Sequence, residues 1–345
     1  MKKTTLSLVV GLWAVLLVAT AAAQDVDLTM TDKDLESEES MWNLYERWCS
    51  VYYASSSSRD LGDVESRFEA FKANARYVSE FNKKEGMTYE LGLNKFADMT
   101  LDEFVAMYAG AKLDAAVLLA SIPEAEEVVG DVPTAWDWRQ HGIITPVKSL
   151  YTYAIATGKL YTLSEQQVLD CSGDGDCVGG NPSKVLTDFA VKKGIALSQY
   201  YPAYSAAKQA CRTAAGTPVV KMDCAVWVPS SNEVALKQSV YKQPVSVLIE
   251  TNSNFQLYRQ GVYNGPCGTS VSHTVIAVGY GVTQDNIKYW TVRNSWGPGW
   301  GESGYIRMKR DIAVKEELCG IAMYGMYPIK RTAAISSIVD VVASY

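Results

Sequence analysis

Apolar and aromatic residues recur every three or four positions over a stretch that ends before the serine run at 55–58. This spacing places them on one face and predicts an amphipathic helix, and the serine run predicts its end. The residues on that face are Met41, Trp42, Tyr45, Trp48, Cys49 and Tyr52.

A second stripe follows in steps of four, four, three, four and four residues, which predicts another helix. Its members are Asp63, Arg67, Phe71, Asn74, Val78 and Asn82. Asp63 and Arg67 stand one turn apart, so we expect their side chains to form an ion pair. Farther on, Thr100 and Glu103 have the spacing of a capping box, which predicts a third helix that continues to Tyr108.

The chain changes character after this third helix. Residues 111–131 are rich in alanine and glutamate without strong periodicity, which predicts an exposed linker that a processing protease can cut. Beyond the linker, helical patterns precede strand patterns. The helical patterns lie at 164–170 and 183–193, and the strand patterns lie at 245–249, 274–280 and 289–292. This order predicts an α+β protein with one mainly helical lobe and one mainly β lobe.

Residues 1–23 contain two lysines, then an apolar run and three alanines, which is the pattern of a secretory signal peptide. A membrane anchor is the alternative, but the run is shorter than the ~20 apolar residues that span a bilayer. The net charge of -6 gives no electrostatic reason to expect a nucleic acid or an anionic membrane as a partner. We therefore expect a protein of the secretory pathway without membrane attachment after signal removal, in which disulfides form.

The chain has two histidines, which limits the choice of a catalytic base. His141 lies in a polar turn and is expected only to face solvent. His273 begins one predicted strand and Asn294 follows the next, so an antiparallel pair would bring the two side chains together. The Asn294 amide oxygen would then fix the imidazole tautomer, and Trp296 would shield that bond from water. The alternative is a strand-end histidine beside a turn asparagine, with no chemical role.

Two motifs in the first hundred residues resemble the propeptide inhibitor domain of cathepsins. The stripe of the second helix is similar to the helix signature of that domain, with Asp63 and Val78 as conservative departures. After it stands a match to the Gly-x-Asn-x-Phe-x-Asp motif of the same propeptides, formed by Gly92, Asn94, Phe96 and Asp98.

The rest of the chain resembles papain-family cysteine peptidases. Segments 132–139, 272–281 and 294–301 are similar to the mature amino terminus, the histidine site and the asparagine site of that family. The resemblance implies a two-lobed α+β papain-like fold with a helical lobe and a β-barrel-like lobe, preceded by a helical propeptide. The implied boundaries are a signal peptide at 1–23, a propeptide at 24–110, an activation linker at 111–131, a peptidase domain at 132–328 and a tail at 329–345.

The resemblance also implies a site. His273 and Asn294 take the catalytic positions, and a glycine turn holds a peptide substrate as an added strand. The residues implied to contact substrate are Gly179, Gly180, Pro182, Val271, Thr274 and Trp296. The implied partners are protein or peptide substrates and the chain's own propeptide, and neither a metal nor an organic cofactor is implied.

Seven cysteines remain to be assigned. The resemblance pairs Cys171 with Cys211, and Cys267 with Cys319. It implies that Cys177 is an unpaired thiol, because the partner of that cysteine lies in a motif that this chain lacks. To the two others, Cys49 and Cys224, the resemblance assigns no partner.

The motif that carries the family's nucleophile, Cys-Gly-Ser/Ala-Cys-Trp, is absent from the chain. Lys148 and His273 are 125 residues apart, so the family spacing requires roughly fifteen to twenty more residues. That stretch would contain the nucleophile, most of the central helix whose amino end favours a thiolate, and the oxyanion donors. We therefore expect a chain that cleaves no peptides and a helical lobe weakened by lost apolar burial.

Three interpretations of this gap stay open. The chain is an imperfect gene model or splice form of an active endopeptidase zymogen, a pseudoenzyme whose propeptide inhibits related proteases, or a protein that binds peptides without cutting them. A catalytic role for Cys177 is a further alternative, but that thiol lacks the helix terminus and the oxyanion donors. The family works in an acidic vacuole or lysosome or outside the cell, so we expect the same compartments here.

Overall fold

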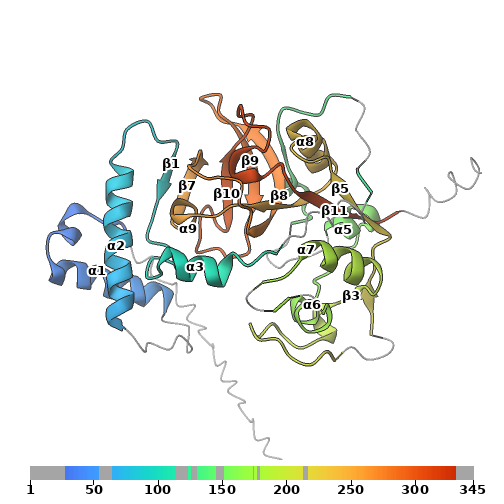
Figure 1. Cartoon of the computed structure of the whole chain (residues 1–345), viewed down its shortest axis with the longest axis horizontal. Helices are drawn as coiled ribbons and strands as arrows, with labels where there is room; N and C mark the ends of the chain where they lie inside the picture. Colours follow the sequence, from blue (N-terminus) through green and yellow to red (C-terminus); the bar gives the residue numbers. More distant parts are fainter. Residues whose placement is uncertain are drawn as a thin grey trace, which may run out of the picture.

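The computed structural model of the chain describes residues 28–53, 64–112, 123–125, 130–144, 151–173, 175–176, 179–212 and 217–331. Several sequence expectations lie outside these residues: the signal peptide, Asp63 and its ion pair, the Lys148–Ser149 junction, the Cys177 thiol and the tail beyond residue 331. Figure 1 shows three parts, which are an N-terminal unit of helices, a central β lobe and a helical lobe. Within the described residues, no helix is both long and apolar enough to cross a membrane.

The N-terminal unit is built on the two helices that the apolar stripes predicted. Helix α1 spans Glu38–Tyr52 and α2 spans Val64–Asn82, and they pack together with the ring centroids of Trp48 and Phe71 5.4 Å apart. The predicted capping box is present at the start of α3, Leu101–Tyr108. The other elements of the unit are the 3-10 turn η1, Asp32–Leu35, and the strand β1, Tyr89–Leu91.

Two asparagines of the α2 stripe hold the segment that follows β1. Asn74 donates to the carbonyl oxygens of Ala97 and Met99 at 2.8 and 2.9 Å. Asn82 bonds both the N–H and the C=O of Leu91, at 3.0 and 2.9 Å. Because these side chains satisfy backbone groups of an irregular segment, they fix the path of the chain toward α3.

The charged members of the two motifs also find partners inside the unit. Arg67 forms an ion pair with Glu103 at 3.2 Å, which connects α2 to the start of α3. Phe96 is fully buried, and Asp98, only 1% exposed, accepts a hydrogen bond from the hydroxyl of Tyr53. The helix stripe and the later motif therefore form one folded unit.

The β lobe contains one sheet that includes β1. The other strands are β2 (Trp136–Asp137), β5 (Cys224–Val228), β6 (Val245–Ile249), β7 (Tyr258–Tyr263), β8 (His273–Val282), β9 (Lys288–Arg293), β10 (Tyr305–Lys309) and β11 (Gly325–Ile329). The strand order is β1-β7-β10-β9-β8-β6-β11-β5, with β2 paired to β8. The helices of this lobe are η2 (Trp138–His141), α8 (Glu233–Lys242), α9 (Ser253–Gln256) and η5 (Leu318–Gly320).

The resemblance implied a barrel-like β lobe, and in the described residues the sheet of this lobe does not close into a barrel. Its two edges are β1 and β5, and they do not pair with each other. The edge at β7 is covered by β1 of the N-terminal unit, where Tyr89 pairs antiparallel with Gly261. Because β7 already pairs with β1, the edge of β7 is not free to pair with another strand and close the sheet into a barrel.

The helical lobe consists of short elements. They are α5 (Tyr151–Thr157), α6 (Glu165–Cys171), α7 (Pro182–Lys184), the π-helical turn η3 (Val185–Val191), η4 (Ser198–Tyr200) and the antiparallel strands β3 (Ile195–Ala196) and β4 (Val219–Val220). Helix α5, at the place expected for the end of the central helix, has seven residues, which is about two turns. The buried apolar residues in the lobe's own cluster are Leu163, Phe189, Ala190, Ile195, Val220 and Met222.

Polar contacts and one cross-link hold this lobe together where apolar burial is small. The Asp170 carboxylate accepts from the Gln166 amide at 2.8 Å, the Gln209 N–H at 2.7 Å and the Tyr201 hydroxyl at 3.0 Å. Next to Asp170, the Cys171–Cys211 disulfide connects α6 to the segment that contains Gln209. The stability of the helical lobe therefore depends on these few hydrogen bonds and this disulfide.

The largest hydrophobic cluster of the molecule spans the N-terminal unit and the β lobe together. Trp48, Phe71 and Phe96 enter it from one side and Phe255 and Trp300 from the other, all of them fully buried. Burial of one such side chain contributes about 1.5 to 3 kcal/mol. Because the two parts share one core, we expect them to unfold together and the helical lobe to be the less stable part.

A buried carboxyl group closes the loop between β10 and β11. Glu317 is 4% exposed and accepts the backbone N–H groups of Asp311 and Ile312 at 3.1 and 3.3 Å. Its backbone has a φ of 58°, in the region that favours glycine. Burial raises the pKa of Glu317 to about 7, although the two N–H groups lower it.

Stability is expected to fall as the pH rises through this pKa. The folded-state pKa of Glu317 lies above its usual 4.5, so the protonated form stabilises the fold fully below pH 4.5, and this contribution is lost as the pH passes about 7. Glu317→Gln should remove on the order of 1 to 2 kcal/mol of the fall in unfolding free energy between pH 5 and pH 8. Urea denaturation at both pH values checks this, with exposed Glu85→Gln as the control. A pH profile that Glu317→Gln leaves unchanged contradicts the prediction.

Candidate active site

Antiparallel pairing of β8 and β9 brings a histidine and an asparagine together. His273 is the first residue of β8, and Asn294 directly follows the last residue of β9. A distance of 2.9 Å separates His273 Nε2 from Asn294 Oδ1. Both side chains are buried. They lie where the antiparallel arrangement inferred from the sequence would place them.

This hydrogen bond assigns roles to the two ring nitrogens. An amide oxygen only accepts, so Nε2 of His273 carries the hydrogen and Nδ1 is the basic nitrogen of the neutral ring. The same oxygen of Asn294 accepts the N–H of Ser295 at 2.7 Å, which fixes the amide orientation. Among the described residues, Asn294 Nδ2 is buried without a hydrogen-bond partner. The arrangement can hold a general base in one tautomer and one ring plane.

The indole of Trp296 covers this bond. Its ring stacks on His273 with centroids 4.6 Å apart and planes 23° apart, and the side chain is 4% exposed. The other aromatic rings around the indole are Phe255 and Trp300 of the β lobe and Phe96, Phe104 and Tyr108 of the N-terminal unit. A shielded hydrogen bond is stronger than one in water, so this cluster stabilises the His–Asn geometry.

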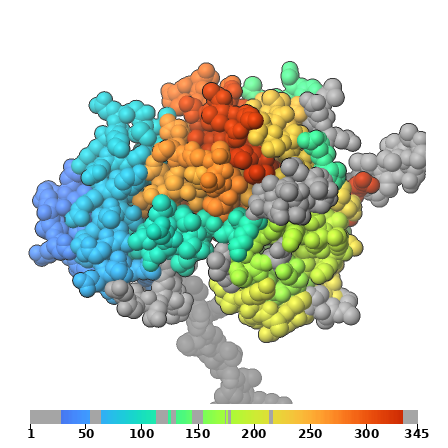
Figure 2. All heavy atoms as spheres, in the orientation of Figure 1, coloured from blue at the N-terminus to red at the C-terminus, as the bar shows by residue number. Residues whose placement is uncertain are grey.

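The Gly179–Gly180 turn holds a strand of the chain itself. Ala111 forms a parallel bridge with Gly180. The Gly180 N–H donates to the carbonyl oxygen of Gly110 at 3.2 Å, and its own oxygen accepts the N–H of Lys112 at 3.0 Å. Figure 2 shows the end of the teal N-terminal segment running between the orange β lobe and the yellow-green helical lobe. Residues 110–112 thus lie in the cleft between the lobes.

The β lobe holds the same strand from the other side. The N–H of Ala111 donates at 2.8 Å to the carbonyl oxygen of Ser272, the residue before His273. A Cβ atom at Gly179 would lie 1.7 Å from the carbonyl oxygen of Gly110, so this approach requires glycine. The sequence predicted an exposed linker from residue 111, yet its first two residues lie beside the histidine.

Three other residues implied to contact substrate are Val271, Thr274 and Pro182. Val271 and Ala111 pack against one apolar cluster that includes Trp227 and Leu248. Thr274 pairs with Leu248 across β8 and β6, and Pro182 is the first residue of α7. Of these three residues, Val271 is the one that packs in the same cluster as Ala111 of the strand.

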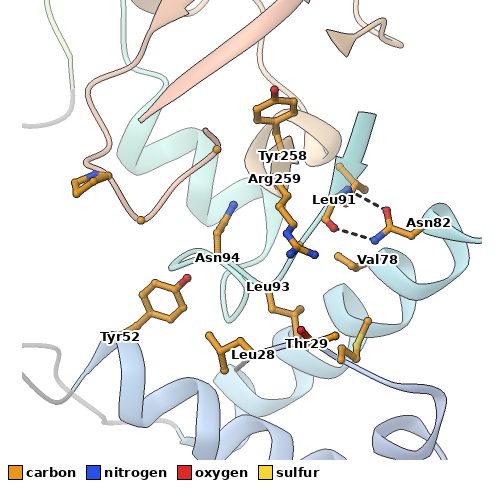
Figure 3. A pocket seen from close by; sticks show the side chains of 15 residues that line it. Leu28, Thr29, Tyr52, Val78, Asn82, Leu91, Leu93, Asn94, Tyr258 and Arg259 are labelled. Carbon is orange, nitrogen blue, oxygen red and sulfur yellow. Dashed lines mark hydrogen bonds between the residues drawn. The ribbon is translucent and has the colours of Figure 1, made fainter. Parts of the chain in front are cut away.

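A cavity of about 380 Å³ lies against the Gly179–Gly180 turn and α6. Two more lie toward the N-terminal unit. The larger, about 900 Å³, lies beside Asn294 and Trp296 and reaches Glu165 and Tyr204 of the helical lobe. The smaller, about 310 Å³, lies between the N-terminal unit and the β lobe, and Figure 3 shows Arg259 extending toward it. The described wall of the smaller cavity contains neither histidine nor cysteine, so it lacks the imidazole and the thiol that a cysteine peptidase uses.

Both disulfides that the resemblance implied are present, Cys171–Cys211 and Cys267–Cys319. Cys49 and Cys224 are free thiols, and burial raises the pKa of each. A raised pKa disfavours the thiolate, so neither has the character of an activated nucleophile.

His141 has a packing role that the sequence did not predict. It is exposed, as expected, but its ring also stacks on Trp136 with centroids 4.3 Å apart. His141 therefore belongs to an aromatic contact that is distant in sequence from His273 and Asn294. Across the described part of the chain, no group of three or more His, Cys, Asp or Glu side chains could hold a metal ion.

Sequence patterns missed the residues that fasten the N-terminal unit and the linker. Pro123 and Ala125 exchange backbone hydrogen bonds with Trp227 at 3.0 and 2.6 Å, inside the predicted linker. Asn254 bonds Tyr77 across 177 residues of sequence. Small residues at 110–111 were the one available signal, because a narrow cleft admits only small side chains.

Family profiles match both parts of this arrangement. The profile of papain family cysteine proteases matches residues 132–329, and that of the cathepsin propeptide inhibitor domain matches residues 45–104. Thiol protease SEN102 from Hemerocallis sp. is 42% identical, covering 89% of this chain and 91% of its own length. Vignain from Vigna mungo is 42% identical, covering 93% of this chain and 94% of its own length.

Solved structures of precursors match the whole arrangement. The proform of the Amb a 11 cysteine protease, a ragweed pollen allergen, has a TM-score of 0.78 at 37% identity and covers 88% of this chain and 99% of its own. The recombinant stem bromelain precursor has a TM-score of 0.73 at 38% identity and covers 84% and 98%. The N-terminal unit is thus a propeptide inhibitor domain, and the chain belongs to the papain family of cysteine proteases.

Proposed function

We propose that this chain folds as a papain-family zymogen and, as encoded, cleaves no peptide bonds. One contrast carries the proposal: His273 and Asn294 form their 2.9 Å pair, yet the sequence has no cysteine between Cys49 and Cys171. In an active member, an imidazole held in this way takes the proton of a thiol and the sulfur attacks the substrate carbonyl. The peptide C–N bond then breaks, the imidazolium gives its proton to the departing amine, and an acyl-enzyme thioester remains. Without that sulfur, the base has no proton to remove.

The alignment with a relative supports a gap inside the chain. The match to Vigna mungo vignain extends over 347 positions, more than the 345 residues of this chain, although it includes only 93% of them. The relative therefore contains residues within the matched region that this chain lacks. We infer that the loss includes the nucleophile and most of the central helix, because only 125 residues separate Lys148 from His273.

The cleft is also closed by the propeptide. Residues 110–112 use the backbone groups of Gly180 that a bound peptide would use as an added strand. Phe96 and Phe104 cover Trp296, which shields the His–Asn bond. Protein or peptide substrates therefore need release of the propeptide before they can enter.

A second candidate function is inhibition of related proteases by the propeptide. The described propeptide contacts go to the β lobe and to the Gly179–Gly180 turn, so docking on a relative does not need the missing segment. The chain's own β lobe competes, since a tethered partner acts at an effective concentration in the mM range. Inhibition in trans, and equally the binding of a foreign peptide in the cleft, requires a cut in the linker and release.

The proposed location follows from the amino terminus and the cross-links. A signal peptide at residues 1–23 would direct the chain into the secretory pathway. Two disulfides agree with an oxidising compartment. We place the protein in the extracellular space or in a vacuole or lysosome.

The chain is expected to hydrolyse no peptide, even after the linker is cut and the propeptide that closes the cleft is removed, and the vignain control is processed in the same way. With a fluorogenic peptide at acidic and neutral pH, the rate should equal that of buffer, and His273→Ala should give the same rate because the base has no thiol to activate. A thiol-directed epoxide, followed by mass spectrometry, should leave Cys177 unlabelled. Vignain supplies the active control. Hydrolysis that disappears in His273→Ala, or turnover with a label on Cys177, contradicts the proposal.

The origin of the gap is decided by sequencing the transcript across the codons of Lys148 and Ser149. An in-frame segment with Cys-Gly-Ser/Ala-Cys-Trp would mean that the complete product is an ordinary zymogen. Direct continuation from one codon to the next would mean that the cell makes a pseudoenzyme.

Gly179→Ala is expected to expel residues 110–112 from the cleft, because its Cβ would collide with the backbone of Gly110. Amide hydrogen exchange at Ala111 and Lys112 should rise about tenfold or more as their hydrogen bonds open. Gly299→Ala is the control, since its Cβ meets only the Tyr52 side chain at an ordinary 3.4 Å. Equal exchange in both variants would show that the turn does not hold the strand.

A further inference from the structure

The docking face of the β lobe presents one buried carboxamide to the propeptide. Asn254 lies in α9 and is 5% exposed. Its Oδ1 accepts a hydrogen bond from the hydroxyl of Tyr77 on α2, and its Nδ2 donates to the hydroxyl of Tyr89 on β1 at 2.8 Å. A single side chain of the protease domain therefore contacts two tyrosines of the propeptide.

The chain of hydrogen bonds continues from Tyr89 into the protease backbone. The Tyr89 hydroxyl donates to the carbonyl oxygen of Gly265 at 2.6 Å, and its ring packs between Phe81 and Tyr263 at 4.9 and 4.8 Å. Burial raises the pKa of Tyr89 to about 12, so the hydroxyl is neutral and both donates and accepts. A side chain that fits between the two tyrosines must therefore accept a hydrogen bond from the Tyr77 hydroxyl and donate one to the Tyr89 hydroxyl.

Other polar contacts at this face discriminate less between sequences. The pairing of β1 with β7 uses backbone groups, the Gln256 amide donates to the backbone oxygen of Phe96 at 3.1 Å, and the buried Asn94 amide donates to the backbone oxygen of Gln256 at 2.8 Å. Each of these bonds has a backbone group on at least one side, so none of them requires a matched pair of side chains. The side-chain bond from Gln260 to Glu90, at 2.8 Å, is exposed, and contacts of that kind contribute little.

We propose that Asn254 is the residue with which the β lobe selects its propeptide. A propeptide with the Tyr77 and Tyr89 hydroxyls then fits papain-family β lobes that present a side-chain amide at this place and rejects those that present an apolar side chain. An apolar group leaves the buried Tyr89 hydroxyl short of one partner. This inference deepens the proposed function and rests on its docked propeptide.

The test uses the full chain, nicked between propeptide and protease. A cleavage site for a sequence-specific protease is placed within residues 113–122, and a tag marks the propeptide. Nicked Asn254→Leu complex is mixed with an equal amount of nicked unsubstituted complex that carries the tag. The mixture is then diluted until most copies of both β lobes have lost their propeptide, because saturated lobes would share the tag equally. At equilibrium, native mass spectrometry measures how the tagged propeptide that is still bound divides between the two β lobes.

The tagged propeptide should favour the unsubstituted lobe over Asn254→Leu by about thirtyfold, since one hydrogen bond is lost at each end of the amide and one hydroxyl is left buried. Tyr77→Phe in the tagged propeptide should lower that preference by about fivefold, because one of the two contacts is gone. Gln260→Leu is the control, with a preference within about twofold of equal partition.

Equal partition between the unsubstituted and Asn254→Leu lobes overturns the inference, as does a preference that Tyr77→Phe leaves unchanged. If the Asn254→Leu complex does not survive nicking, release of the Tyr77→Phe propeptide from the unsubstituted lobe decides. Release about threefold faster or more supports the inference, and an unchanged rate overturns it. Peptide hydrolysis by the full chain would overturn the proposed function alone, since these partition ratios do not depend on catalysis.

Discussion

The indole of Trp296 contacts both the His273–Asn294 pair and the propeptide. One face stacks on His273 and covers its bond to Asn294, while Phe96 and Phe104 of the propeptide pack against its edges. An uncovered indole would lose this apolar burial and admit water toward the imidazole. The propeptide therefore does more than occupy the cleft, because it also completes the dry environment of the His273–Asn294 pair.

The two lobes differ in what a lost helix would do to them. His273 and Asn294 both come from β8 and the end of β9, inside the core that the β lobe shares with the propeptide. The helical lobe has only a small apolar cluster of its own, supported by the bonds of Asp170 and one disulfide. A loss from the central helix would therefore weaken the helical lobe while the His–Asn geometry persists.

Periodicity and local chemistry predicted the helices and strands, and they predicted contacts only between residues that are close in sequence. Three predictions involve residues within about twenty positions of each other: the stripe of α2, the Thr100 capping box and the approach of His273 to Asn294. Over such short separations, helix and strand geometry determine which side chains come into contact. The bond from Tyr77 to Asn254 joins residues 177 apart, and no local rule relates them. The open sheet escaped prediction for the same reason, since a distant segment covers its edge.

The state of Asn294 bears on why the pair is still present. Its side chain and that of His273 are both buried, and burying two polar groups costs desolvation free energy that apolar side chains would not cost. A fold maintained for stability alone would gain from replacing the histidine and the asparagine with apolar side chains of similar shape. The pair carries that cost and keeps its 2.9 Å geometry, which favours a history in which the base had a thiol to serve. That argument favours a recent loss, or a segment missing only from the encoded form, over a long-established binding protein.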